Sequence, residues 1–161
     1  MTINLDTAID RVVELEIEAL NALSTPVPSD AKPYFFHWQE EFPYWTNRLG
    51  TMTQGEQDEE FDEPEYTLVM RLVIGHLTQD YDGFNEDKLK QWIPHICTYF
   101  SQRRWLQTAT TSAGLSNLVE ARITGCTGFR VLQSVGLPGI QLGCEFNLRC
   151  RFVEQIDLTY G

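Results

Sequence analysis

The chain has 161 residues, of which 42% are apolar and 12% aromatic, enough to bury one ordinary hydrophobic core but not two. Its 12 basic residues are outnumbered by 23 acidic ones, and the net charge of -11 disfavours binding to nucleic-acid phosphates by counterion release. No apolar run is long enough to span a membrane, and the N-terminus lacks the blocks of a signal peptide. We therefore expect one domain, residues 1–161, made in the cytosol and without a membrane partner.

The first predicted element is an amphipathic helix within residues 1–23. Apolar residues recur there at three- and four-residue steps from Leu5 to Leu23, and either Asn4 or Asp6 can cap the helix. The acidic side chains of this helix are expected on a solvated face rather than in a site: Glu14, Glu16 and Glu18.

Residues 33–49 are dense in aromatic side chains. We predict an edge strand, an interruption centred on Pro43 and a further extended piece. Because aromatic residues fall in both phases of the strand, a helix or a partner must cover one side. The aromatic residues are Tyr34, Phe35, Phe36, Trp38, Phe42, Tyr44 and Trp45.

Residues 51–65 form the most acidic segment of the chain and contain no basic residue. The carboxylates are Glu56, Asp58, Glu59, Glu60, Asp62, Glu63 and Glu65. Their mutual repulsion predicts an extended, mobile loop. Calcium binding is the alternative, but the ligand spacing and central glycine of an EF-hand are absent, so we predict no metal site.

Two elements are expected after the acidic segment. Residues 66–77 are nearly all apolar and rich in β-formers, which predicts a central strand. A helix should then run from its cap at Asn85 to about Arg104, with Pro94 bending or dividing it.

The clearest pattern in the chain is the alternation of apolar and polar residues from 140 to 153. Apolar residues occupy the even positions, which predicts a β-strand with one dry face and one wet face. At about 3.3 Å per residue the strand would be roughly 43 Å long, close to the diameter of the whole domain. Either a bulge interrupts it, with Gly143 as the candidate, or its end meets another subunit.

Residues 118–124 and 129–133 are expected to complete a C-terminal β-hairpin with this strand. The elements together predict an α+β fold. Its antiparallel β-sheet would carry the N-terminal helix and a second helix packed on one face.

Motifs for enzymatic chemistry are absent from the sequence. The three histidines, His37, His76 and His95, fall in different predicted elements, so none has a neighbouring carboxylate or nucleophile assigned to it. The four cysteines form no Cys-x-x-Cys pair and are predicted to be reduced and metal-free, with Cys144 and Cys150 on one buried face. We predict no catalytic residue, no cofactor and no enzymatic activity.

Three stretches carry a resemblance to a known family. They are Phe-Pro-Tyr-Trp-Thr-Asn-Arg-Leu-Gly at 42–50, the predicted helix at 86–104, and Gly-Ile-Gln-Leu-Gly-Cys-Glu-Phe-Asn-Leu-Arg-Cys-Arg-Phe at 139–152. With the order of the predicted elements, they resemble the tail-terminator and neck proteins of tailed bacteriophages. The aromatic density of residues 34–45 is greater than that family leads one to expect.

The resemblance implies a structural virion protein that forms a ring, commonly a hexamer, and joins the phage tail tube to the neck. Its partners would be copies of itself, the tail tube protein and the connector protein of the neck, while genomic DNA passes through without specific binding. The ring would assemble in the host cytoplasm and reside in the virion. The acidic segment 51–65 would face the channel or a partner. The subunit interface is expected on residues 33–46 and 140–156, through Phe36, Trp38, Phe42, Trp45, Arg149 and Arg151.

Two other classes of protein remain open. A small α+β ligand-binding or enzymatic domain would be a monomer with an aromatic pocket, lined by Trp38, Trp45 and Trp92. An acidic adaptor that binds a host protein through residues 51–65 would be a monomer without a pocket.

Overall fold

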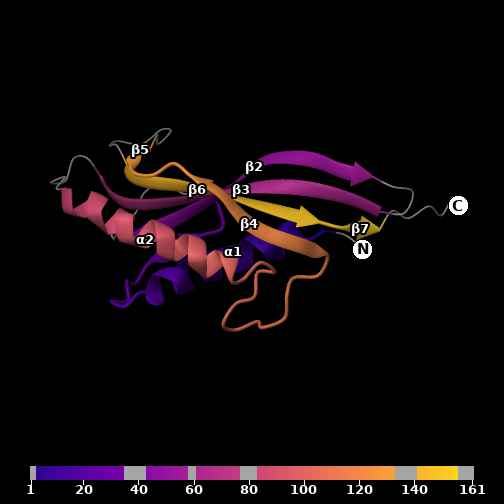
Figure 1. Ribbon diagram of the computed structural model, residues 1–161, viewed down its shortest axis with the longest axis horizontal. Helices are drawn as coiled ribbons and strands as arrows, with labels where there is room; N and C mark the ends of the chain where they lie inside the picture. The colour runs from indigo at the N-terminus through magenta and orange to yellow at the C-terminus, as the bar shows by residue number, and fades with distance from the viewer. Residues whose placement is uncertain (1–2, 35–42, 58–60, 77–82, 133–140, 156–161) are drawn as a thin grey trace, which may run out of the picture.

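The computed structural model describes residues 3–34, 43–57, 61–76, 83–132 and 141–155. Helices α1 (Leu5–Asn21) and α2 (Gly83–Ser101) lie on one face of a mainly antiparallel sheet (Figure 1). The strands are β1 (Asp30–Lys32), β2 (Tyr44–Gln57), β3 (Phe61–His76), β4 (Leu118–Cys126), β5 (Arg130–Leu132), β6 (Gln141–Phe152) and β7 (Glu154–Gln155). Their order is β1-β2-β3-β6-β4, with β5 paired to β6 and β7 paired to β3. This is the α+β architecture predicted from the sequence.

Helix α1 begins at one of its two predicted caps. The side chain of Asn4 accepts a hydrogen bond from the backbone N–H of Thr7 at 3.1 Å, which satisfies one of the free donors of the first turn. The buried apolar residues follow the predicted stripe: Ala8, Val12, Leu15, Ala19 and Leu20.

Helix α2 starts at Gly83, before the predicted cap at Asn85, and Pro94 lies inside it without dividing it. The imidazole Nε2 of His95 lies 2.7 Å from the carbonyl oxygen of Ala19, a hydrogen bond that joins α2 to α1. The role of this histidine is therefore structural, as expected.

The acidic segment does not form the predicted loop. Residues 51–57 continue β2 and residues 61–65 begin β3, so most of it is an antiparallel hairpin that extends past α2 (Figure 1). The strand ladder satisfies backbone N–H and C=O groups, and the alternation of side chains puts Asp62 of β3 on one face and Glu63 and Glu65 on the other. Their repulsion is therefore weaker than in a run of adjacent charges. Residues 58–60 lie outside the described residues.

Strand β6 is not interrupted at Gly143. The irregularity lies on the partner strand, where Ile74 is the extra residue between the pairs Val73–Gly143 and Gly75–Leu142. A Cβ atom at Gly143 would collide with the carbonyl oxygen of Leu72. The glycine is thus needed for the close approach of the two strands, while the bulge belongs to β3.

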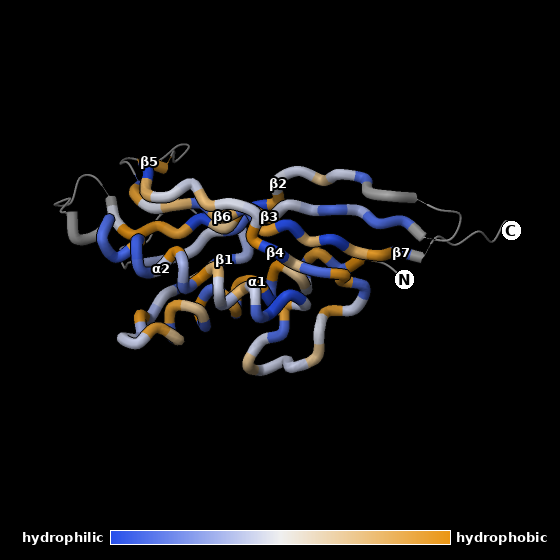
Figure 2. Tube along the Cα trace, viewed as in Figure 1, coloured by the Kyte–Doolittle hydropathy of each residue, from blue (hydrophilic) through white to orange (hydrophobic). Residues whose placement is uncertain are grey.

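The two faces of the sheet differ in composition, and residues of both kinds alternate along the strands (Figure 2). The covered face, beneath α1 and α2, carries the even-numbered apolar residues of β6, and Phe146 packs its ring 5.8 Å from that of Trp45. The open face, on the opposite side, carries the odd-numbered residues. It is not uniformly wet as predicted, because Gln141 and Glu145 are buried there while Asn147 is exposed.

Candidate functional site

The open face of the sheet concentrates the arginines of this acidic protein. Strand register places six of the nine arginines on it: Arg48, Arg71, Arg122, Arg130, Arg149 and Arg151. Five strands, β2 to β6, contribute them, and they form two groups separated along the strands. We call the group around Glu145 the Glu145 cluster and the group around Glu120 the Glu120 cluster.

The Glu145 cluster consists of Arg71, Glu145, Arg130, Gln141 and Tyr44. The carboxylate of Glu145 bridges two cations, with 3.4 Å to Arg71 Nη2 and 3.2 Å to Arg130 Nη2. The side chains of Arg71 and Glu145 are 8% and 9% exposed, whereas that of Arg130 is 47% exposed. Gln141 accepts from Arg71 Nη1 at 3.5 Å and donates to the hydroxyl of Tyr44 at 2.8 Å. The cluster is therefore a buried network with one cation at its rim.

The Glu145 cluster has more positive than negative charge. Burial lowers the pKa of the Arg71 guanidinium, Glu145 opposes that shift, and the positive charges of Arg48 and Arg130 add to it. One carboxylate thus faces three guanidinium groups, those of Arg71 and Arg130 within the cluster and that of Arg48 beside it. Arg48 is exposed and forms no ion pair with a described residue.

The Glu120 cluster is more exposed and its charges are nearly balanced. Glu120 lies 4.0 Å from both Arg149 and Arg151, and Glu65 lies 3.9 Å from Arg149. These long contacts leave each cation partly in solvent, where an ion pair contributes little to stability. The two predicted interface arginines are therefore on the open face, but they are already partnered within the chain.

The outer edge of β2 is a second uncovered feature. Strand β1 pairs with β2 only from Tyr44 to Thr46, and no other described strand pairs with this edge. Along the free part, Leu49 is 49% exposed and Met52 is 56% exposed. An uncovered edge with apolar side chains favours pairing with another chain.

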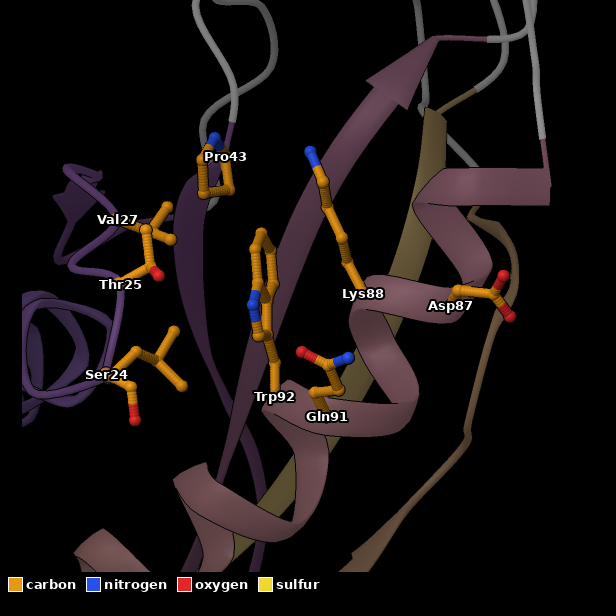
Figure 3. Close-up of a pocket in the computed structure, with 9 residues that line it drawn as sticks. Ser24, Thr25, Val27, Pro43, Asp87, Lys88, Gln91 and Trp92 are labelled. Atoms are coloured by element: carbon orange, nitrogen blue, oxygen red, sulfur yellow. The ribbon is translucent and has the colours of Figure 1, made fainter.

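A pocket of about 610 Å³ lies beside α2, and Figure 3 shows the indole of Trp92 between Lys88 and the loop that follows α1. Its lining residues are Leu23, Ser24, Thr25, Val27, Pro43, Asp87, Lys88, Gln91 and Trp92. Trp45 does not line it, because that side chain is fully buried against the sheet. The prediction that Trp45 lines a pocket with Trp92 is therefore wrong, and Trp38 lies outside the described part of the chain.

Two of the four cysteines are hydrogen-bonded to each other. The thiol contact with Cys144 and the N–H of Gly128, 3.5 Å from the sulfur, lower the pKa of Cys126 to about 7. The same contact and burial raise the pKa of Cys144, and burial raises the pKa of Cys150 to about 12. All four cysteines are free. Cys144 and Cys150 share the covered face, which confirms the prediction that one buried face holds both. Among the described residues no three side chains are grouped to hold a metal ion.

The prediction that Glu16 lies on a solvated face is wrong, because its side chain is fully buried. It accepts a hydrogen bond from Asn47 Nδ2 at 2.7 Å, yet Glu16 Oε2 and Asn47 Oδ1 lack a described partner. Burial raises the pKa of Glu16 well above its ordinary value, and the Asn47 hydrogen bond opposes that shift. The carboxyl is thus favoured in its protonated form, which supplies a donor.

The other two glutamates of α1 also make structural hydrogen bonds. Glu14 accepts from the hydroxyl of Thr110 at 2.9 Å, and Glu18 accepts from the backbone N–H of Ala109 at 2.8 Å. Tyr99 of α2 donates to Glu18 at 3.0 Å. The acidic face of α1 therefore contacts α2 and the loop after it. The prediction that this face is only solvated is wrong for these residues.

The predicted site residues are dispersed by the fold. Asp62, Glu63 and Glu65 lie on β3 and Glu56 on β2, while Asp58, Glu59 and Glu60 lie outside the described residues. Of the predicted interface, Trp45 is in the core, and Phe36, Trp38 and Phe42 are outside the described residues.

The sequence analysis missed Arg71, Arg130 and Glu145, which meet from three strands. The sequence contained a signal for Arg71, because it is the only charged residue in the nearly apolar run 66–75 and must find a partner when buried.

A comparison with protein-family models found no match to the sequence, and a comparison with curated proteins found none. Within the described part of the chain, neither α1 nor α2 is long and apolar enough to cross a membrane.

Proposed function

We propose that this chain is a structural subunit of a tailed-bacteriophage virion, a tail terminator whose copies form a ring that joins the tail tube to the neck. The observation that supports it best is the outer edge of β2, which pairs with no described strand beyond Thr46 and carries the exposed Leu49 and Met52. A protein that acts alone normally blocks such an edge with charge, proline or another element. A subunit of a closed ring does not need to block the edge in this way, because the neighbouring subunit covers it.

The charge distribution is consistent with this function. A net charge of -11 disfavours tight binding of a polyanion, as a ring that lets genomic DNA slide through it requires. The partners of the ring would be the tail tube protein and the neck connector, and it would assemble in the host cytoplasm before becoming part of the virion. Six copies are expected from the resemblance described above.

The test is the mass of the protein in solution and in purified tails, measured by light scattering and by native mass spectrometry. Leu49→Lys should prevent ring formation, because a lysine on an edge strand opposes pairing with a second strand. Val131→Lys is the matched control, since Val131 is 53% exposed but lies on β5, away from the β2 edge. A chain that is monomeric at high micromolar concentration and occurs in no ring in tails contradicts the proposal.

The pocket beside α2 supports a second candidate, a small-molecule binding domain. Trp92 is 7% exposed and supplies an aromatic wall, and Asp87, Lys88 and Gln91 supply polar groups. A ligand in this pocket would change the fluorescence of Trp92, and Trp92→Phe would remove that change. Ligand binding by a stable monomer of 18.6 kDa would favour this candidate over the ring.

A further inference from the structure

The sheet carries opposite charges at the two ends of its strands. The Glu145 cluster lies beside β5, whereas the start of β3 is acidic, with Glu63 on the open face and with Asp62 and its pair partner Glu154 of β7 on the opposite face. Figure 1 places β5 and this end of the β2–β3 hairpin toward opposite ends of the long axis. The molecule is therefore polar along that axis, with a basic end and an acidic end.

The two ends cannot neutralise each other within one chain. Glu63 and Arg71 lie on the same strand, eight residues apart, which corresponds to roughly 26 Å at about 3.3 Å per residue. An ion pair requires the charged atoms to approach within about 4 Å. Charge compensation between the two ends therefore requires a second molecule.

Both ends retain charged groups that could contact such a molecule. At the basic end, Arg48 is exposed without an ion pair to a described residue, and Arg130 is half exposed although it contacts Glu145. At the acidic end, Glu63 forms no ion pair with a described residue. Arg48 also directly precedes Leu49, so the basic end is continuous with the free edge of β2.

Carboxylates fit the basic end better than a nucleic acid does. Glu65, Glu120 and Glu145 interrupt the arginines of this face, and the rest of the chain is acidic, so an extended polyanion would be repelled along most of its length. The acidic end of another copy presents a few carboxylates on a short hairpin. It is also present at the same concentration as the basic end.

We propose that the basic end of one copy, formed by Arg48, Arg71 and Arg130, binds the acidic end of the β2–β3 hairpin of a second copy. The contact joins two different surfaces, so it is heterologous and repeats head to tail until it closes into a ring or continues as a filament. This inference rests on the proposed ring function and names the surfaces that would close the ring.

A charge-exchange experiment tests it. Arg48→Glu with Arg130→Gln leaves two acidic ends. Glu63→Arg with Glu65→Gln replaces the two open-face carboxylates of the acidic end by a cation and a neutral amide. Each variant alone should associate about tenfold more weakly or worse, because like charges then meet. An equimolar mixture of the two variants should recover association, since each supplies the end that the other lacks.

Lys90→Glu with Arg104→Gln is the matched control. It changes the net charge as much as the first variant does, but at exposed sites on α2 and in the segment after it. This variant should associate like the wild type, and added salt should weaken association of the wild type. Thermal denaturation of each variant verifies that it is folded.

The outcomes separate the two proposals. If the wild type forms a ring that both charge variants leave intact, or if the mixture recovers nothing, the charge contact is wrong and the ring function stands. Suppose instead that the wild type forms open filaments, that each variant alone does not, and that the mixture forms filaments again. The charge contact then stands and the ring function fails. A wild type that is monomeric in solution and in tails refutes both.

Discussion

The covered and open faces of the sheet are made by the same strands but are stabilised differently. On the covered face, β6 contributes Cys144, Phe146 and Leu148 to an apolar core closed by two helices. On the open face the residue between the first two, Glu145, joins a network of charges that neither described helix covers. Apolar burial is not weakened by charge screening, whereas ion pairs at an exposed rim are. The chain thus has one face suited to holding its fold and another suited to contact.

The largest effect should come from the covered face. Phe146→Ala removes a fully buried ring that packs on Trp45, and the loss of burial together with the cavity should lower the free energy of unfolding by about 3–5 kcal/mol. Val131→Ala on β5 is the exposed control and should change it by less than about 0.5 kcal/mol. Urea denaturation gives both values. Similar losses for the two variants would mean that Phe146 is not in the core.

A change at the Glu145 cluster should be nearly as large, although this face is open. Glu145→Ala leaves the buried guanidinium of Arg71 without its carboxylate, which should cost about 3 kcal/mol. Adding Arg71→Met should recover most of that loss, because the cost arises from the unpaired charge. If the double variant is as unstable as the single one, the pair does not act through charge compensation.

Glu16 makes stability on the covered side of the sheet depend on pH, although that side is mostly apolar. Its raised pKa means that the folded state binds a proton more tightly than the unfolded state, so its contribution is full below the unfolded pKa of about 4.3. Stability is then lost as pH rises through the raised pKa of the folded state. Glu16→Gln should therefore stabilise the protein at pH 7 and flatten this part of the profile.

Urea denaturation between pH 4 and pH 8 measures the effect of Glu16. Glu14→Gln on the same helix is the control and should keep the pH dependence of the wild type, because Glu14 is exposed. Parallel pH profiles for the wild type and Glu16→Gln would show that Glu16 is not the titrating group.

The smallest effect is expected at the Glu120 cluster. Its contacts with Arg149 and Arg151 are 4.0 Å long and partly exposed, so Glu120→Gln should cost less than about 1 kcal/mol. The difference from the wild type should shrink further in 0.5 M NaCl, because salt screens exposed pairs. A loss as large as that of Glu145→Ala would show that the two clusters are energetically alike.

Local patterns in the sequence determined the elements whose signals lie within a few residues. The alternation from 140 to 153 predicted β6, the three- and four-residue steps predicted α1, and Asn4 was one of its two expected caps. Each depends on backbone geometry, in which side chains repeat every 2 or 3.6 residues, so a single segment carries enough information. The assignment to the α+β class followed from the order of these elements.

Only the tertiary structure decided the features that depend on pairing between distant residues. The acidic run became a hairpin because β2 and β3 satisfy each other's backbone groups, and charge alone does not reveal such a partner. Glu16 is buried where Asn47 of β2 can donate a hydrogen bond to it. The bulge opposite Gly143 lies on β3, at Ile74, and not on β6. The arginines of the open face come from several strands and meet only after folding. The net charge of the sequence, -11, therefore gave no indication of this local positive charge. Strand register, which brings distant segments side by side, created that charged surface.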